Sequence, residues 1–321
     1  MLYSVTSSMK ANDKTRLDFA ADVDFDQILT NPILDIAARF WDSDRYRAFT
    51  ICYRSMRAID DLVDDRKTSG AKISAGEAAD IARMIDDWLE SMCGGRPRDS
   101  FDREFLDVRD RFAIPLWPWK RLRNAMVYDI QHDGYRNFLT FLRYTEGAAV
   151  APAAIFTHLC GVRQGRGGYE RPVYDIRWSA RPLAVFSYLV HIIRDFQKDA
   201  RRDLNYFALD MLGHYSLTVE DLSRIARGGQ ISPSFRGLIG RYRSIAEYYR
   251  QSARKRIDSV IPCMLPRYQL SMEIIYALYH QIFERIDPDN GTFSGPELMP
   301  SAGEVKARLE LTLERFSPVE N

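Results

Sequence analysis

The 321-residue chain has few cysteines and no long apolar run. Its four cysteines are widely spaced and form no C-x-x-C pair, which argues against a disulfide framework and a structural zinc site. The longest uncharged run, 147–162, contains a proline and is shorter than the roughly 20 residues that cross a bilayer. The N-terminus lacks the apolar core and cleavage site of a signal peptide. We therefore expect a cytoplasmic protein with no transmembrane segment.

The sequence also lacks an excess of either charge, because 45 Lys and Arg residues stand against 44 Asp and Glu residues, a net charge of +1. This balance provides no overall positive field of the kind that non-specific nucleic-acid binding needs. The composition, 46% hydrophobic and 28% charged, is typical of a globular protein with a large core. We therefore expect a globular protein that does not bind nucleic acid.

Strand-like alternation is scarce, whereas apolar residues recur mostly at three- and four-residue spacing. This periodicity predicts an all-α protein whose helices are separated by stretches rich in glycine and proline. No internal repeat or long linker divides the chain, so we predict one helical domain, 26–321, after a polar and loosely ordered segment, 1–25. The expected helices cover 44–66, 75–92, 100–112, 118–132, 136–162, 178–203, 218–227, 234–260, 265–286 and 302–316.

The expected helix at 136–162 contains the run GAAVAPAA, which puts small side chains on every face. Small side chains let neighbouring backbones approach closely, or they leave room for a bulky apolar ligand. Close packing is the commoner use, and the sequence leaves both interpretations open.

Aspartate is frequent, with 30 Asp against 14 Glu, although Glu is the better helix former. Four aspartates fall within 60–65, inside an expected helix. One face of that helix carries Tyr53, Arg57, Asp60 and Asp64 between apolar flanks. Carboxylates one turn apart suit Mg²⁺, which takes one or two carboxylates and completes its shell with water and phosphate oxygens. The alternative is a solvated helix with surface salt bridges.

A second polar face is expected late in another helix, where His191, Asp195 and Asp199 recur every four residues. Basic residues, among them Arg194, crowd the same turns. Cations beside carboxylates suit an anion that is carried by a metal ion. Two such faces on helices of one bundle can face each other, as in bundle-core metal sites, so together the motifs favour a joint site for metal and anion.

Weaker signals accompany these motifs. Asp129, His132 and Asp133 form a third polar patch, although a capped helix end explains it equally well. The glycine-rich stretch 165–168 lacks the Gly-Lys-Ser/Thr of a phosphate loop and is expected to be an ordinary loop. The sequence contains no H-E-x-x-H and no G-x-S-x-G, which argues against a catalytic zinc and against a serine hydrolase.

At the two aspartate motifs the sequence resembles the squalene/phytoene synthase family, over roughly residues 30–290. YRSMRAIDDLVDD places Tyr53 and Arg57 before the first aspartates, as the family does. HIIRDFQKDARRDLNYF matches the family's second motif at Arg194, Asp195, Asp199 and Tyr206. The resemblance implies a single-domain isoprenoid-synthase helical bundle around a central apolar cavity, in which two or three Mg²⁺ ions bind together with the substrate diphosphate.

The resemblance also implies roles for individual residues. The metal-binding residues would be Asp60, Asp64, Asp195 and Asp199. The diphosphate-binding residues would be Arg57, Arg194 and His191, and the catalytic residues would be Tyr53, Arg57 and Tyr206. The chain departs from the family at His191, where the family usually has a metal-binding Asn. Imidazole is a poorer Mg²⁺ ligand than an amide oxygen, so His191 is expected to ligate either metal or diphosphate.

The activity that the resemblance implies is the head-to-head coupling of two prenyl diphosphates through a cyclopropylcarbinyl diphosphate. A squalene-type reaction of farnesyl diphosphate is favoured narrowly over a phytoene-type reaction of geranylgeranyl diphosphate. The alternatives are cyclisation of one prenyl chain, prenyl transfer to another acceptor, and a non-catalytic helper that binds a prenyl lipid or a protein partner. Use of NADPH, peripheral membrane association for release of an apolar product, and the oligomeric state stay open.

Overall fold

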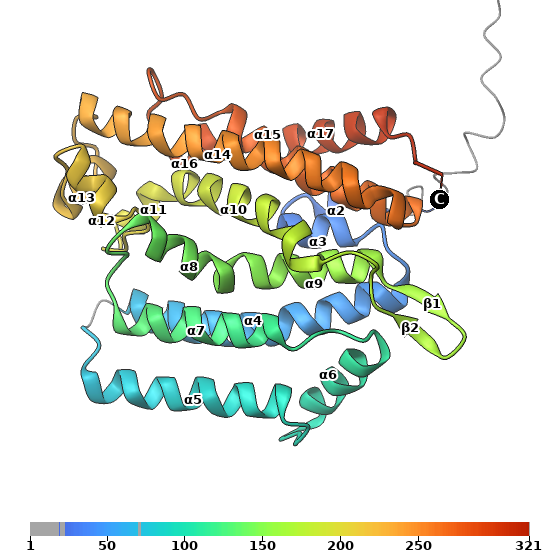
Figure 1. Ribbon diagram of the computed structural model, residues 1–321. Coiled ribbons are helices and arrows are strands. Elements are labelled where there is room, and N and C mark those ends of the chain that lie inside the picture. The colour runs from blue at the N-terminus through green and yellow to red at the C-terminus, as the bar shows by residue number, and fades with distance from the viewer. Residues whose placement is uncertain (1–18, 20–22, 70–71, 321) are drawn as a thin grey trace, which may run out of the picture.

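The computed structural model describes residues 19, 23–69 and 72–320, so most of the segment 1–25 lies outside the described residues. The longer helices are α4 (Ser43–Thr68), α5 (Ala75–Cys93), α6 (Ser100–Arg111), α7 (Trp117–Gln131), α8 (Phe138–Ala148), α9 (Val150–Gly161), α10 (Ile176–Arg194), α13 (Val219–Ala226), α14 (Pro233–Val260), α15 (Pro266–Glu284) and α17 (Ala302–Arg315). Figure 1 shows them stacked in layers, from α5 at the lower edge to α14, α15 and α17 at the upper edge. The all-α prediction is therefore confirmed.

Several short elements were not predicted. They are α2 (Phe25–Ile28), α3 (Ile33–Ala38), α12 (Leu209–His214), η2 (Ile261–Cys263), α16 (Gly295–Leu298), β1 (Arg163–Gly165) and β2 (Gly168–Glu170). A further short helix, α11 (Phe196–Ala200), lies inside the expected helix at 178–203. The expected loop at 165–168 is the turn of an antiparallel hairpin in which Arg163 pairs with Glu170. Elements of one or two turns contain too few residues for an apolar period to be recognised.

The expected helix at 136–162 is in fact two helices, α8 and α9. They meet at Ala149, whose φ of −123° and ψ of −45° leave the helical region. Pro152 explains the break, because its nitrogen has no proton to donate to the carbonyl four residues earlier and its ring crowds that carbonyl. The chain changes direction at the run of small residues.

The expected helix at 178–203 is also divided, into α10 and α11. Asp195 lies between them with φ −92° and ψ 0°, and Asp203 has φ 58°, a left-handed conformation in which a helix cannot continue. The backbone N–H of Asp199 still donates to the carbonyl of Asp195 at 3.0 Å. Asp199 therefore follows Asp195 by one turn although the helix is interrupted.

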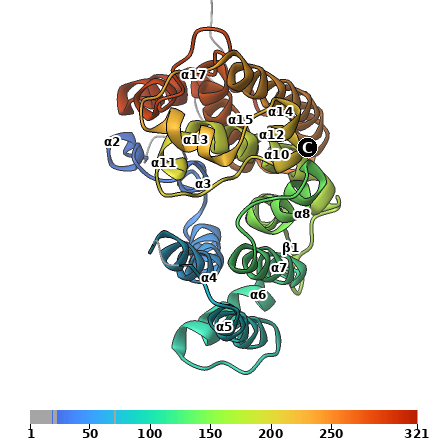
Figure 2. The ribbon, with the colours of Figure 1, turned by 90° about the vertical axis from the view of Figure 1, so that its left-hand side faces the viewer.

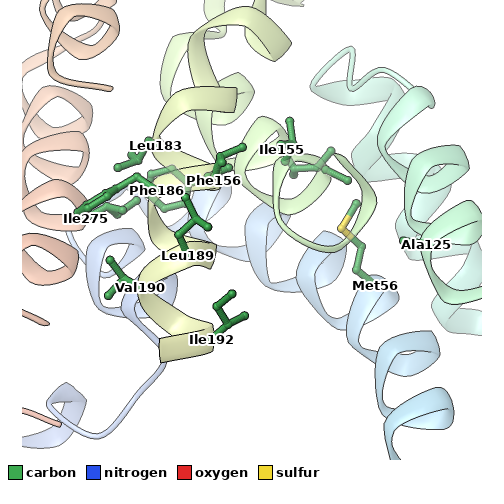
Figure 3. Packing of buried hydrophobic residues seen from close by; sticks show 14 of the residues in the cluster. Met56, Ala125, Ile155, Phe156, Leu183, Phe186, Leu189, Val190, Ile192 and Ile275 are labelled. Carbon is green, nitrogen blue, oxygen red and sulfur yellow. The ribbon is translucent and has the colours of Figure 1, made fainter. Parts of the chain in front are cut away.

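The core is densest around α9, in which ten of twelve residues are buried. This helix packs against both α4 and α10. Figure 3 shows Ile155 and Phe156 of α9 beside Leu183 and Phe186 of α10, with Ile275 of α15 on the far side. The apolar faces of four helices thus meet at one centre.

The two aspartate motifs lie at the same end of the molecule. The C-terminal ends of α4, α7 and α10 all lie on the left in Figure 1, and Figure 2 shows that end with α11 and α13 facing the viewer. Within the described residues, no helix is both long enough and apolar enough to span a bilayer. The arrangement places the charged motifs at one end of an apolar bundle.

Candidate active site

A cavity of about 530 Å³ opens among the helices, a size within the roughly 300–1,000 Å³ of small-molecule sites. The side chains that line it include all nine residues assigned to the site from the sequence: Tyr53, Arg57, Asp60, Asp64, His191, Arg194, Asp195, Asp199 and Tyr206. They come from α4, from the junction of α10 and α11, and from the segment after α11. Two motifs that are far apart in sequence therefore border one cavity.

The rest of the cavity wall is mostly apolar. It is built of small and aliphatic side chains, among them Ile33, Leu34, Met56, Leu122, Ala148, Ala149, Ala153, Leu183, Ala184 and Ile275. Both interpretations of the small-residue run hold, on different faces. Ala149 and Ala153 border the cavity, whereas a Cβ on Gly147 would lie 2.2 Å from the carbonyl oxygen of Arg121 and 2.5 Å from the Cβ of Ala125 on α7.

The first motif carries a carboxyl group with an unusually high pKa. Burial and the charge of Asp64 raise the pKa of Asp60 to about 7. They do so although Arg57 forms ion pairs with both Asp60 and Asp61. Because a nearby cation favours the charged form of a carboxyl group, a further cation at Asp60 would be stabilised.

The carboxyl group of Asp199 is affected by that of Asp64, which belongs to the other motif. Burial, followed by the charges of Asp195 and Asp64, raises the pKa of Asp199 to about 6. Burial and the charge of Asp129 raise the pKa of Asp64. Positive charge bound in the cavity would favour the charged form of all these carboxyl groups.

Asp195 behaves in the opposite way. Burial disfavours its charged form, but hydrogen bonds from Arg194 and His191 outweigh burial and hold its pKa well below the usual range. Nε of Arg194 lies 2.6 Å from Oδ1 of Asp195, and Nε2 of His191 lies 3.0 Å from Oδ2. Asp195 is therefore charged and already paired.

The two tyrosines of the predicted site are neutral and partly buried. Burial raises the pKa of Tyr53, and burial with the neighbouring Tyr188 raises the pKa of Tyr206 far above its ordinary value. Such hydroxyls keep their protons at neutral pH. Both residues line the cavity, together with the charged residues of the two motifs and the apolar side chains.

Sequence reasoning did not assign Asp129 to the site, although its charge raises the pKa of Asp64. Asp129 is buried in α7, where Lys67 donates to its Oδ1 at 2.6 Å and the Tyr144 hydroxyl to its Oδ2 at 3.4 Å. Asp129 is 5% exposed, whereas a carboxylate that only capped a helix end would lie in solvent. The available signal was a charged residue between the apolar Met126 and Ile130 of one helix.

The donor set fits a metal ion that arrives with a phosphate ligand. Across residues 19, 23–69 and 72–320, no three His, Cys, Asp or Glu side chains gather closely enough to hold a metal ion by themselves. Mg²⁺ needs no such cage, because it is usually bound by one or two carboxylates plus water and phosphate oxygens. Asp60, Asp64 and Asp199 supply such carboxylates on both sides of the cavity.

Comparison with known proteins agrees with this arrangement. The squalene/phytoene synthase family model matches residues 35–310. The chain is 26% identical over 250 residues to a chloroplastic phytoene synthase of Narcissus pseudonarcissus, covering 77% of this chain and 54% of that protein. It is 28% identical over 203 residues to phytoene synthase 2 of Zea mays, covering 62% and 48%. The chain thus spans about half the length of the curated relatives it matches.

Solved structures show the same fold. A dehydrosqualene synthase in complex with a ligand matches with a TM-score of 0.66 at 15% identity, covering 94% of this chain and 97% of that chain. A squalene synthase from Alicyclobacillus acidocaldarius matches with a TM-score of 0.58 at 16% identity, covering 78% and 87%. The fold is therefore that of the isoprenoid synthases. Because the family model covers most of its length, the chain belongs to the squalene/phytoene synthase family.

Proposed function

We propose that the protein joins two prenyl diphosphates head to head in a Mg²⁺-dependent reaction, through a cyclopropylcarbinyl diphosphate. The observation that carries the proposal is one cavity with a charged mouth and an apolar wall, in which carboxylates of both motifs stand beside Arg57 and Arg194. Family membership and the names of the curated relatives support the same activity.

The charged mouth suits the departure of diphosphate. Mg²⁺, when held by Asp60, Asp64 and Asp199 together with the substrate, would supply positive charge to the departing group. Arg57 and Arg194 would orient that group through charge-assisted hydrogen bonds. Breaking the C–O bond of one donor leaves an allylic cation, and the double bond of the second donor attacks it. Loss of one proton then closes the cyclopropane ring.

The apolar wall suits the cations that this reaction forms. Side chains such as Met56, Leu183 and Ile275 exclude water, which would otherwise capture a cation early. Tyr53 and Tyr206 also line the cavity, and an aromatic face there would stabilise positive charge. The second diphosphate leaves the cyclopropylcarbinyl carbon, and the rearranged cation is quenched by hydride, water or proton loss.

The proposed chemistry identifies the donor as a prenyl diphosphate, but it does not determine the length of the prenyl chain. The sequence favours farnesyl diphosphate narrowly, whereas the curated relatives are named phytoene synthases, and the resemblance implies geranylgeranyl diphosphate for a phytoene-type reaction. We retain farnesyl diphosphate as the proposed donor. Cytoplasmic location and peripheral membrane association stay predictions.

The decisive experiment supplies farnesyl or geranylgeranyl diphosphate with Mg²⁺, with and without NADPH, and analyses the extract by mass spectrometry. Head-to-head coupling gives a product with twice the carbon number of the donor, formed only with Mg²⁺, and the product is a hydrocarbon after quenching by hydride or proton loss and an alcohol after quenching by water. A product with the carbon number of one donor would contradict the proposal and indicate cyclisation. Comparing the samples with and without NADPH shows whether hydride quenches the final cation.

A further inference from the structure

The carboxylate of Asp195 is already occupied by side chains of its own helix. Nε of Arg194 donates to Oδ1 at 2.6 Å, and Nη2 donates to Oδ2 at 2.9 Å. Nε2 of His191 lies 3.0 Å from the same Oδ2. An ionised carboxylate has about four lone-pair sites, so a single one remains on Asp195, and it lies beside a guanidinium that would repel a metal cation.

His191 has no lone pair left for a metal ion. Nη2 of Arg194 lies 3.2 Å from Nδ1 of His191. Because a guanidinium can only donate, Nδ1 must be the acceptor, and Nε2 then carries the ring proton and donates to Asp195. Both ring nitrogens are therefore in use, so the imidazole fixes Arg194 and has no nitrogen free to bind a metal ion, although His191 borders the cavity.

These contacts leave one nitrogen of Arg194 available. Within the described part of the chain, Nε and Nη2 are both engaged by Asp195 or His191, whereas Nη1 contacts no acceptor. Arg194 borders the cavity, and its side chain is only 14% exposed. Its two remaining protons are thus held ready for an anion in the cavity.

Asp199, one turn further along, differs from Asp195. Among the residues that the structure describes, no side chain forms a hydrogen bond or ion pair with its carboxylate. It borders the same cavity, and the carboxylate of Asp64 acts on it from the opposite side. Asp199 therefore has the free oxygens that Asp195 lacks.

We propose that the residues of the second motif have different roles. Asp199 is its metal ligand, whereas Asp195 and His191 are positioning residues that fix Arg194 for binding of diphosphate. This inference rests on the proposed function and deepens it. It departs from the sequence expectation in two ways: Asp195 does not bind metal, and His191 contacts neither metal nor diphosphate but orients the arginine that does.

The test counts bound Mn²⁺, a substitute for Mg²⁺, by electron paramagnetic resonance with inorganic pyrophosphate present. Calorimetry measures pyrophosphate affinity at saturating Mg²⁺. Asp195→Asn and His191→Phe are expected to keep the number of bound Mn²⁺ ions seen in the wild type. Both should weaken pyrophosphate binding about tenfold, the lower end of the loss in affinity that follows when a residue that orients a ligand-binding group is removed. Asp199→Asn is expected to lower the Mn²⁺ count. Asp203→Asn is the matched control, because Asp203 is exposed and outside the cavity, and Asn tolerates its positive φ.

A fall in the Mn²⁺ count of Asp195→Asn or His191→Phe would overturn the inference. His191 is 45% exposed, so its variant carries the test even if Asp195→Asn does not fold. The two proposals fail separately. If the wild type makes the coupled product but these variants bind fewer Mn²⁺ ions, only the proposed roles of Asp195 and His191 are wrong. If the wild type binds no Mn²⁺ with pyrophosphate, the Mg²⁺-dependent function is wrong as well.

Discussion

Nζ of Lys67 lies 2.6 Å from Oδ1 of Asp129, and this ion pair joins α4 to α7 beside the first aspartate motif. Both side chains are almost fully buried, 12% exposed for Lys67 and 5% for Asp129. Lys67 lowers the pKa of Asp64, whereas Asp129 raises it. The pair therefore limits how much negative charge the motif bears while no ligand is bound.

Lys67→Met should destabilise the protein, because it leaves Asp129 buried without its cation. Breaking such a pair from one side costs about 3–5 kcal/mol, measurable as a lower urea midpoint. The double variant Lys67→Met/Asp129→Asn should be less unstable than the sum of the single variants. Lys120→Met, at an exposed position of α7, should change the free energy of unfolding by no more than about 0.5 kcal/mol.

Asp60→Asn and Asp64→Asn should lose Mg²⁺-dependent release of diphosphate while the fold survives. The amide cannot replace a carboxylate charge at the mouth, and the loss should be about 100-fold or more in kcat/KM. Asp65→Asn is the control on the same helix, because Asp65 is exposed and does not border the cavity. Near-normal turnover in either cavity variant would remove the metal role from that residue.

Ala153→Phe should shorten the apolar part of the cavity. The added ring would occupy space that the prenyl chain needs, so turnover should fall by about tenfold or more, most strongly for the longer donor. Binding of Mn²⁺ with pyrophosphate should stay unchanged, because the charged mouth is separate. Ala79→Phe, at an exposed position of α5, should alter neither quantity. Equal losses for both donors would show that Ala153 does not limit chain length.

Stability should fall in acid because of His158. Burial lowers its pKa from 6.5 to about 4, against the effect of its hydrogen bond to the Phe112 carbonyl at 2.9 Å. Between these values the unfolded chain binds the proton and the folded chain does not, so stability rises with pH across this window. The contribution of the neutral His158 to the free energy of unfolding is complete above the pKa of the histidine in the unfolded chain. It decreases by up to about 3 kcal/mol as the pH falls towards 4.

Urea unfolding at about pH 7 and about pH 5 checks this window. His158→Asn should lower stability at neutral pH but show a smaller difference between the two conditions than the wild type. His132→Asn, at an exposed position, should leave that difference unchanged. If the free energy of unfolding of His158→Asn depends on pH as strongly as that of the wild type, the acid sensitivity arises from other groups.

The long helices were predictable because their apolar period repeats over several turns. The expected 75–92 and 302–316 correspond to α5 and α17 within one residue at each end. The meeting of the motifs was predictable for the same reason, since four-residue spacing keeps Asp60 and Asp64 on one face. Every assigned residue borders the cavity, and their chemical roles stay predictions.

Other features depend on contacts between distant segments. The burial of Asp129 arises where α7 packs against α4, and no local pattern contains that information. The pairing of Asp195 depends on the side-chain rotamers of Arg194 and His191, which the spacing of the motif leaves open. The division of the helix at 136–162 was predictable from Pro152, which lies inside it, but the alanine-rich run favours an unbroken helix.

The position of α9 between α4 and α10 has a mechanical consequence. The two aspartate motifs belong to separate walls, each packed on α9. A metal-bound diphosphate would link the C-terminal ends of α4 and α10 for as long as it stays bound. Amide hydrogen exchange at the last turns of both helices should therefore slow when the metal and diphosphate bind. Exchange at both places should become faster again when they dissociate.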